Sequence, residues 1–558
     1  MFGISNSSAI YKVLIGLLVL LVASVIVLSC VPPVTKDELV HHLALPKLYL
    51  KHGGMYEIPF MEFSYYPMNL QLLYMIPLAF GQDLLPKFIH FAFALLSAWL
   101  VFAYLKKRLD TVYALFGALF FLSLPIIVKL SITAYIDLGV IFFSTASLLL
   151  ILKWMESGFS RKHLITSGIM CGLGLGTKYN GLITFFLLTF FVPFLYARYA
   201  GGKKPGFSKA ATQGILFVSI SLLVFSPWMA RNFAWTGNPV YPLYDRWLSP
   251  SKGISQDSLA STQHQRIELG HFTVREALYH ETWWEMALLP VRVFFQGKDG
   301  SPKYFDGKLN PFLLLLPLFS LYRREQEDPV VRAEKNILMA FVVLYFSFAL
   351  FSTALRIRYI APIIPPLAIL SAYGLKRVFD LAAGVHFRWK RAATSAAMIV
   401  PAISLGLNGD YLYSQFKEVR PFSYLKGSVS REEYISNYCF EYPALKYINE
   451  SLGTDARVLF VFLGDRGYYC DRDYVLDNGA LSRIVKRASD SKEVLLGLKQ
   501  MGITHLLIRY DIFDPWSQSE FDGRQKQVLQ GFMETHTKLL YGKWGYGVSC
   551  LVGGELAG

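Results

Sequence analysis

Charged residues are scarce in this sequence. Only 17% of its 558 residues are Asp, Glu, Lys or Arg, whereas 53% are hydrophobic and 15% are aromatic. This composition excludes disordered, collagen-like and disulfide-dense chains, and it argues against an ordinary soluble protein, whose surface carries more charge. The sequence therefore predicts an integral membrane protein.

Cysteine is also rare. The five cysteines are Cys30, Cys171, Cys439, Cys470 and Cys550, and they form no CxxC pair and show no zinc-ligand spacing. They indicate neither a metal module nor a disulfide framework. A single bridge among the last three stays open.

Cations exceed anions among the few charged residues. The chain has 55 Lys and Arg against 40 Asp and Glu, a formal net charge of +15. Such an excess is typical of nucleic-acid-binding proteins, but a polytopic membrane protein also collects cations, in its short cytoplasmic loops. The position of the cations decides between these two classes.

About eleven apolar runs approach the length of helix that crosses a bilayer, which is about 20 residues. The first run has no small-residue cleavage site after it, so we expect an uncleaved membrane helix there. The runs lie near 13–31, 84–104, 111–128, 137–152, 164–176, 181–197, 211–229, 309–321, 336–354, 359–374 and 392–407.

The connections between these runs predict the orientation. With the N-terminus in the cytoplasm, every short basic cluster falls on the cytoplasmic side, near 106–108, 153–162, 198–209, 323–335 and 376–391. This distribution obeys the positive-inside rule and explains most of the positive charge. We therefore expect membrane lipids, and no nucleic acid, as partners.

The chain divides into two predicted domains. Residues 1–409 form the transmembrane domain with outer loops at 32–83 and 230–308, and residues 410–558 form an outer, soluble α/β domain. Within the second domain, 458–464, 503–510 and 546–551 are typical of strands, and a helical stretch includes 492–501. The sequence shows neither a repeat of fixed period nor an inverted pair of broken helices of the transporter kind.

Several carboxylates are predicted at the outer interface. Asp37 and Glu38 follow the first run after two prolines, and Asp137 opens the fourth run. Helix capping is one interpretation of Asp37 and Asp137, and a functional site is the other, because ionisable groups at a membrane are costly. His41 and His42 follow on the same predicted helix, and either is a candidate metal ligand, because a carboxylate and an imidazole one turn apart, such as Asp37 and His41, could share a cation.

Three cations break the positive-inside pattern. Lys178, Arg356 and Arg358 fall on the outer side, where snorkelling to lipid headgroups is the simplest explanation. Lys178 follows a glycine-rich stretch, 172–176, that does not match a phosphate loop, and helix packing explains these glycines better.

The coincidence of these groups suggests a chemistry. Carboxylates and cations from distant segments converge on one membrane interface, which suits a reaction at a lipid-linked phosphate. Cations would stabilise the leaving phosphate as it gains charge, and a carboxylate would accept a proton from the attacking group. The pattern predicts a transferase with an amphiphilic donor.

The same residues carry a resemblance to a known family. The motifs are the acidic pair 37–38, Tyr135-Ile136-Asp137, Thr177-Lys178-Tyr179, Arg231-Asn232 with the Gly237-Asn238-Pro239-Val240-Tyr241-Pro242 stretch, and Arg356-x-Arg358-Tyr359-x-x-Pro362. Their order and sidedness resemble the GT-C glycosyltransferases, and most closely the bacterial protein O-mannosyltransferase and aminoarabinose transferase superfamily. The resemblance covers essentially the whole chain, including the α/β domain.

This resemblance implies an inverting transfer of a sugar from a polyprenyl-phosphate donor to a lipid, glycan or protein acceptor. It implies a bacterial inner membrane protein whose site and C-terminal domain face the periplasm. Asp37 would be the general base, Glu38 would orient the acceptor or a cation, and Asp137 would be the second acidic residue. The donor phosphate would be held by Lys178, Arg356, Arg358 and Tyr359.

The roles of three further residues stay open. Tyr65 and Tyr66 would line the sugar or lipid pocket, or belong to an interfacial aromatic belt. Arg231 would contact lipid phosphate or cap its helix.

Whether the site binds a metal ion is also left open by the sequence. The resemblance permits a divalent ion at Asp37, Asp137 and His41, but the three outer cations could supply the same positive charge, so no cofactor is certain.

Other classes of protein remain as alternatives. A flippase or transporter of lipid-linked sugars would need ionisable residues inside several spans and pseudo-symmetric halves. A polysaccharide ligase or polymerase would depend on outer arginines more than on the acidic pair, and a receptor would have no use for the charge cluster. The C-terminal domain lacks GxGxxG, which favours an acceptor-binding or stabilising role over nucleotide binding.

Overall fold

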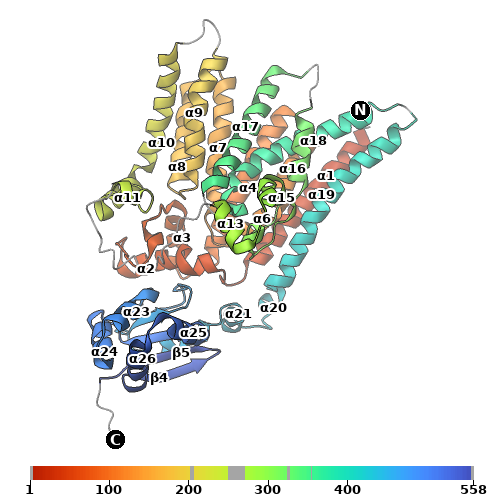
Figure 1. The fold of residues 1–558 in the computed structure, drawn as a ribbon. Helices are drawn as coiled ribbons and strands as arrows, with labels where there is room; N and C mark the ends of the chain where they lie inside the picture. Colours follow the sequence, from red (N-terminus) through yellow and green to blue (C-terminus); the bar gives the residue numbers. More distant parts are fainter. Residues whose placement is uncertain are drawn as a thin grey trace.

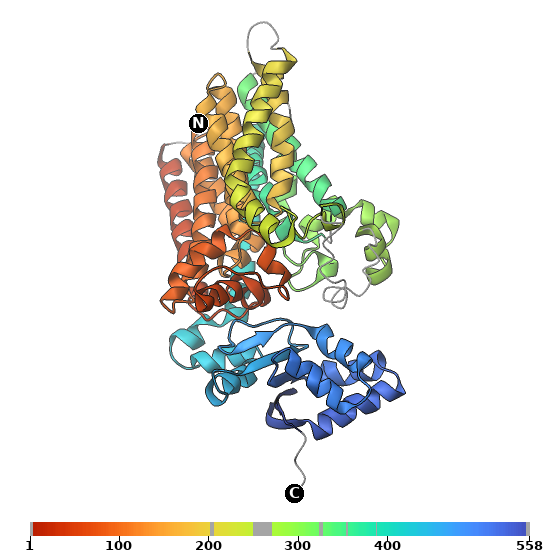
Figure 2. The same ribbon diagram turned by 90° about the vertical axis from the view of Figure 1, so that its left-hand side faces the viewer.

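A helical bundle and a smaller domain with a β-sheet make up the protein (Figure 1). The computed structural model describes residues 4–200, 206–248, 271–322, 327–352, 355–386 and 388–553. The C-terminal domain lies below the bundle, and the short helices α2 and α3 lie between the two (Figure 2).

Long helices build the bundle. Helix α7 packs against α8, α8 against α10, α4 against α5, and α16 against α18. The bundle helices are α1 (Ile4–Ser29), α4 (Leu85–Arg108), α5 (Thr111–Ser123), α6 (Pro125–Ser131), α7 (Asp137–Glu156), α8 (Arg161–Leu175), α9 (Gly181–Tyr199), α10 (Phe207–Thr236), α16 (Phe312–Ser320), α17 (Pro329–Ser352), α18 (Ile364–Ala383) and α19 (Lys390–Val419).

Within the described residues, each of the eleven apolar runs overlaps one of these helices or, for 111–128, the pair α5 and α6. Seven of the described helices are long and apolar enough to cross a membrane, and the pair α5 and α6, bent by 65°, makes an eighth if it is counted as one span. Helices α8 and α16 are shorter, with 15 and 9 residues, and α18 carries three charged residues near its end. The multi-pass membrane class is confirmed, and the number of eleven spans stays a prediction.

The glycine-rich stretch before Lys178 serves helix packing, as predicted. A Cβ atom at Gly172 would lie 2.5 Å from the carbonyl oxygen of Ser221 on α10. The glycine therefore lets α8 and α10 approach more closely than a larger residue would allow.

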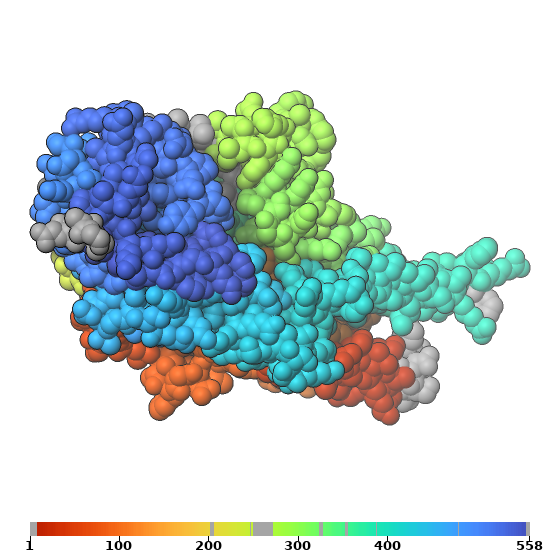
Figure 3. All heavy atoms as spheres, turned by 90° about the horizontal axis from the view of Figure 1, so that it is seen from below, coloured from red at the N-terminus to blue at the C-terminus, as the bar shows by residue number. Residues whose placement is uncertain are grey.

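Short elements occupy the end of the bundle that faces the C-terminal domain. They are a π-helical turn (Glu38–His42), α2 (Ala44–His52), a 3-10 turn (Glu62–Tyr65), α3 (Asn69–Ala79), α11 (Asp245–Leu248), α13 (His271–Tyr279), α14 (Trp283–Ala287), α15 (Leu289–Phe295) and 3-10 turns at Pro302–Tyr304, Ile357–Tyr359 and Ala361–Ile363. Parts of the predicted outer loop 230–308 and of the basic clusters 198–209 and 323–335 lie outside the described residues. Seen from below, α13 to α15 lie beside the C-terminal domain (Figure 3).

The C-terminal domain contains a mixed five-stranded sheet of order β2-β1-β3-β5-β4. Strand β1 pairs in parallel with β2 and β3, whereas β5 pairs antiparallel with β3 and β4. The strands are β1 (Arg457–Val461), β2 (Asp473–Val475), β3 (His505–Arg509), β4 (Thr537–Lys543) and β5 (Tyr546–Leu551). The helices are α20 (Pro421–Leu425), α21 (Arg431–Tyr438), α22 (Tyr442–Ser451), α23 (Asn478–Arg487), α24 (Ser491–Gln500), α25 (Tyr510–Glu520) and α26 (Gly523–Thr535).

The two faces of this sheet have different neighbours. Leu459 and Val461 of β1 belong to a core shared with α23, α24 and α26. Val458 and Phe460 point to the opposite face, whose core continues through α22 to Tyr49 of α2. The alternation along one strand thus joins the C-terminal domain to the end of the bundle.

The α/β prediction for this domain is confirmed, with β1, β3, β5 and α24 close to the expected ranges. All five cysteines lie in the described ranges and are free. The alternative of a bridge among the last three is therefore not realised.

Candidate active site

An ion pair joins the segment after α1 to the turn before α18. The carboxylate of Asp37 accepts a hydrogen bond from Nη1 of Arg358, and the two side chains are 22% and 12% exposed. Asp37 makes no capping hydrogen bond with its side chain, so the capping interpretation is wrong for this residue. Two of the predicted site residues are thus in direct contact.

A second ion pair lies between the starts of α7 and α9. Nζ of Lys178 donates to Oδ1 of Asp137 at 2.7 Å, and Asp137 is buried. The N-cap of α7 is Ile136, and Asp137 stands in its first turn. Lys178 is therefore held by a carboxylate, so the snorkelling interpretation does not describe it.

The ring of Tyr359 connects the predicted cations. Its centroid lies 5.3 Å from Nζ of Lys178 and 5.4 Å and 6.0 Å from the guanidinium carbons of Arg358 and Arg356. Such contacts attract a cation to the face of an aromatic ring. The structure therefore gathers Lys178, Arg356 and Arg358 around one tyrosine, with Asp37 and Asp137 beside them.

The neighbouring charges keep this cluster ionised. Burial alone would raise the pKa of Asp37, but Arg358, His41 and Lys178 outweigh it and hold that pKa below its usual range. Burial alone would lower the pKa of Arg358, and Asp137 and Asp37 reverse this effect and raise it. Asp37 is therefore a carboxylate, and Arg358 a cation, at neutral pH.

Glu38 serves the local fold. Its side chain is fully buried, and its two oxygens accept hydrogen bonds from the backbone N–H of Ala134 at 2.6 Å and of Thr35 at 3.0 Å. The carboxylate thereby ties the segment that carries Asp37 to the loop that precedes Asp137. Glu38 positions the two acidic residues relative to each other.

Two residues of α4 that the sequence analysis did not single out support the same loops. Nδ1 of His90 lies 2.8 Å from the carbonyl oxygen of Thr133, and Nε2 accepts a hydrogen bond from the N–H of Leu138 at 3.0 Å. Nζ of Lys87 donates to the carbonyl oxygen of Val31 at 2.8 Å. The available signal was two ionisable residues one turn apart in an apolar run.

Asp37, His41 and His42 form a cluster that could hold a metal ion. One ligand atom from each lies within 4.8 Å of the others. This cluster contains Asp37 and His41 of the predicted set together with His42, and it does not include Asp137. Burial, with Lys178 and Arg358, lowers the pKa of His41 to about 4 against the effect of Asp37.

The donors of this cluster fit a divalent metal. A neutral imidazole is the form that binds metal, and two imidazoles with a carboxylate are a donor set that Zn²⁺ accepts. Nδ1 of His41 is buried and has no hydrogen-bond partner, as expected of a nitrogen that is free to ligate.

Arg231 anchors the turn that carries Tyr65 and Tyr66. Its guanidinium lies 4.6 Å and 4.8 Å from the ring centroids of Trp228 and Trp235. It donates to the backbone carbonyls of Tyr65 at 2.6 Å and of Tyr66 at 3.1 Å. Arg231 thus fixes this turn to the end of α10.

Tyr65 and Tyr66 themselves have different surroundings. Tyr65 is buried, donates its hydroxyl to Glu57 at 2.7 Å and packs on Tyr241. The half-buried ring of Tyr66 lies 5.4 Å from that of Tyr179, which directly follows Lys178. Of the two, Tyr66 is therefore nearer to the ionic cluster in its contacts.

Comparisons with known proteins support the class of fold. The family dolichyl-phosphate-mannose-protein mannosyltransferase matches residues 80–230, which include Asp137 and Lys178. No curated protein sequence matches the chain.

Solved structures match over nearly the whole chain. ArnT from Cupriavidus metallidurans is 15% identical in its apo state, with a TM-score of 0.57 over 98% of this chain and 98% of that one. The structure of the same protein bound to undecaprenyl phosphate matches with a TM-score of 0.54 and 15% sequence identity, over 96% of this chain and 98% of that one. The oligosaccharyltransferase of Archaeoglobus fulgidus in the apo form matches with a TM-score of 0.52 and 13% sequence identity, over 95% of this chain and 74% of that one. These matches confirm the resemblance: the chain has the GT-C glycosyltransferase fold.

Proposed function

We propose that this protein is a glycosyltransferase that moves a sugar from a polyprenyl-phosphate donor to an envelope lipid, glycan or protein acceptor, with inversion. The observation that carries the proposal is the pair of contacts Asp37–Arg358 and Asp137–Lys178 around Tyr359. A similar fold, ArnT from Cupriavidus metallidurans, has been solved with undecaprenyl phosphate bound, which supports a lipid-linked donor.

The cations bind the donor phosphate. Arg358 and Lys178 are held near each other by the two carboxylates and by Tyr359, so they meet the phosphate without a large rearrangement. As the bond between the sugar C1 and the phosphate oxygen breaks, the leaving polyprenyl phosphate gains negative charge. Fixed cations stabilise that charge more in the transition state than in the ground state.

Asp37 accepts the proton of the acceptor. The acceptor hydroxyl oxygen attacks C1 from the side opposite the phosphate, the new C–O bond forms as the old one breaks, and the configuration inverts. The hydroxyl proton passes to the carboxylate of Asp37. When Arg358 turns from Asp37 to the phosphate, the carboxylate becomes more basic. A phosphate acceptor, in contrast, would need little help from a base.

Other residues position these groups. Asp137 holds Lys178, and Glu38 and His90 fix the loops that carry the two aspartates. The precision of these supports matters because small displacements of catalytic groups cost large factors in rate.

We also propose that Asp37, His41 and His42 hold a divalent metal ion. Such an ion would add positive charge beside the donor phosphate when it is bound. His41 and His42 would keep it in place as neutral ligands, and Arg358 would remain free to leave Asp37 for the phosphate.

The charges at the two ends of the bundle support an orientation with the site on the outer side. Lys107 and Arg108 at the end of α4 pair with Glu156 of α7, and Arg108 also pairs with Glu334 of α17, so these basic ends lie together. The C-terminal domain lies at the other end (Figure 1), and the segment that carries Asp37 is joined to it by the hydrogen bond from the N–H of Tyr468 to the carbonyl of Leu39. By the positive-inside rule, the proposed site faces the periplasm of a bacterial inner membrane.

The flippase, polymerase and receptor alternatives have less support. The described site charges gather at one end of the bundle, whereas a transporter needs them along a path through it. The fold comparison also favours a transferase with a lipid-linked donor.

A transfer assay tests the proposal. The full chain in nanodiscs is incubated with synthetic undecaprenyl-phosphate sugars and extracted envelope lipids, glycans and proteins, and mass spectrometry identifies what becomes heavier by one sugar. Product from the wild type and none from Asp37→Asn is expected. Absence of product with every donor, or equal product from the variant, overturns the proposal.

A further inference from the structure

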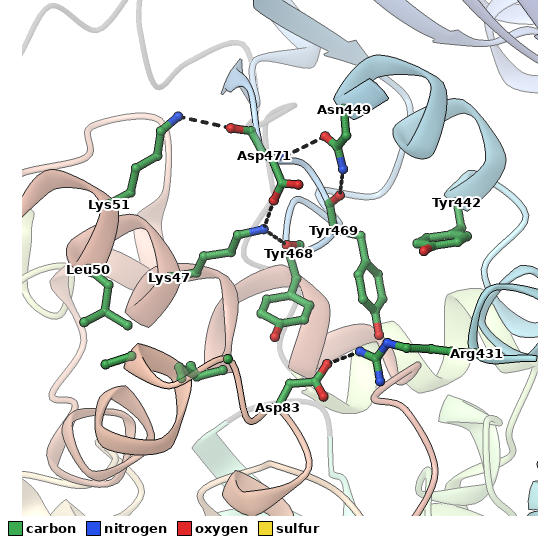
Figure 4. Close-up of a pocket in the computed structure, with 13 residues that line it drawn as sticks. Lys47, Leu50, Lys51, Asp83, Arg431, Tyr442, Asn449, Tyr468, Tyr469 and Asp471 are labelled. Carbon is green, nitrogen blue, oxygen red and sulfur yellow. Dashed lines mark hydrogen bonds and ion pairs between the residues drawn. The ribbon is translucent and has the colours of Figure 1, made fainter. Parts of the chain in front are cut away.

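A groove separates the membrane-side helices from the C-terminal domain. It has a volume of about 540 Å³, and it lies between α2 with the end of α3 on one side and α21, α22 and the 468–471 loop on the other (Figure 4). It is distinct from the ionic cluster, because neither Asp37 nor Arg358 lines it.

Each cation in the groove wall has a carboxylate partner. Nζ of Lys47 lies 2.6 Å from Asp471, and Nζ of Lys51 lies 2.5 Å from Asp473. Arg431 pairs with Asp83 in the same way. The three pairs therefore leave the groove wall without an excess of positive charge.

The same pairs leave many hydrogen-bonding groups available. Lys47 uses its three donors on Asp471 and on the carbonyls of Tyr468 and Cys470. The side chains of Lys51, Arg431 and Asp471 are 47%, 42% and 56% exposed and keep donors or acceptors beyond their ion pairs. A wall of neutralised donors and acceptors matches a ligand that carries many hydroxyl groups and no net charge.

Tyrosines and an amide complete the wall. The rings of Tyr442 and Tyr469 lie edge to face at 5.2 Å, and Nζ of Lys47 lies 5.4 Å from the ring centroid of Tyr468. Asn449 is fixed at both ends, since it donates to the carbonyl of Tyr469 and accepts from the N–H of Asp471, each at 2.8 Å. Rigid aromatic surfaces beside fixed polar groups suit the apolar faces and hydroxyl edges of sugars.

We propose that this groove binds a neutral glycan chain of the acceptor. The proposal deepens the proposed function, because it names the acceptor class as one that carries several neutral sugars. The groove adjoins the reactive segment: the N–H of Tyr468 donates to the carbonyl of Leu39 at 3.1 Å, and the hydroxyl of Tyr469 donates to that of Pro33 at 2.7 Å. A glycan held against these tyrosines therefore lies next to the backbone that carries Asp37.

Direct binding tests the groove without any transfer. The full chain in nanodiscs is titrated with neutral hexasaccharides of glucose, mannose and N-acetylglucosamine, and binding is followed by thermophoresis. Binding of one of these to the wild type is expected, and Tyr442→Ala and Lys51→Gln should each weaken it by about tenfold. Tyr447→Ala is the matched control, because Tyr447 lies on α22, as Tyr442 does, but stacks on Tyr541 of β4.

Four outcomes overturn the groove proposal. The first is that no hexasaccharide binds at millimolar concentration, and the second is that both groove variants bind as the wild type does. The third is that Tyr447→Ala loses as much affinity as the groove variants, and the fourth is that inorganic phosphate or phosphatidylglycerol vesicles compete with the hexasaccharide. The transfer assay gives a separate result. Hexasaccharide binding without transfer would contradict only the proposed reaction, and transfer without hexasaccharide binding would contradict only the proposed glycan-binding role of the groove.

Discussion

Arg358 donates a hydrogen bond to Asp37 across 321 residues of sequence. The pair joins the segment that follows α1 to the turn before α18, and the pair of Lys178 and Asp137 lies beside it. The proposed general base and the proposed phosphate-binding cation are therefore in contact in the absence of a donor. If Arg358 exchanges the carboxylate for the phosphate, as proposed, donor binding is linked to the basicity of Asp37.

Asp37→Asn should lower the transfer rate at least about 100-fold, because the amide cannot accept the acceptor proton. Donor affinity should stay the same or increase, since Arg358 no longer has to leave a carboxylate in order to bind the phosphate. Rates and donor titrations in nanodiscs measure the two quantities. Glu534→Gln, an exposed site on α26, is the control, and near-normal turnover by Asp37→Asn would remove this residue from the mechanism.

Arg358→Ala should raise the donor KM at least about tenfold, the cost of about 1.4 kcal/mol expected for a lost contact to a charged phosphate. Arg358→Lys should retain part of the affinity. Arg356→Ala should have a smaller effect, because Arg356 is 34% exposed and lies 3.6 Å from Asp306. A donor dependence identical to that of the wild type in Arg358→Ala contradicts phosphate binding.

Lys178→Met should destabilise the protein by about 3–5 kcal/mol, because it leaves the buried Asp137 without its partner. The double variant Lys178→Met with Asp137→Asn should recover much of this loss, since no buried charge remains unpaired. Unfolding in bicelles measures both variants. Additive effects of the two single changes would show that the pair is not coupled.

His90→Ala should lower kcat at least about tenfold with little change in donor KM, because His90 orients the start of α7 through the N–H of Leu138 and is not one of the proposed phosphate-binding groups. His90→Gln offers both a donor and an acceptor and should restore part of kcat. If His90→Ala changes KM alone, or if Gln rescues nothing, the positioning role is wrong.

Zn²⁺ or Mn²⁺ should bind the chelator-treated protein with one ion per chain, measured by calorimetry. His41→Ala and His42→Ala should each weaken this binding by at least about tenfold, because each removes a ligand. His163→Ala, at the start of α8 near the basic end, is the control. Metal binding that neither cluster variant affects would place the ion elsewhere.

The sequence identified most helices because apolar runs of sufficient length have few alternatives to helix in a membrane. It also located β1, β3 and β5, whose residues are mostly buried. Strand β2 has only three residues, and β4 contains no buried residue, so neither shows the pattern of a buried strand. The sequence placed Asp37, Asp137, Lys178 and Arg358 at one interface through charge and topology alone.

Only the tertiary structure decided how these groups pair. Contacts between distant segments determine which cation pairs with which carboxylate. They also determine that Glu38 is buried against the backbone of Ala134 and that His42 belongs to the metal-binding cluster. The side of the membrane on which a residue lies can be predicted from the sequence, because it depends on the hydropathy of nearby segments and on the charge of nearby loops. Contact partners are fixed by the packing of helices against one another, and no local pattern carries that information.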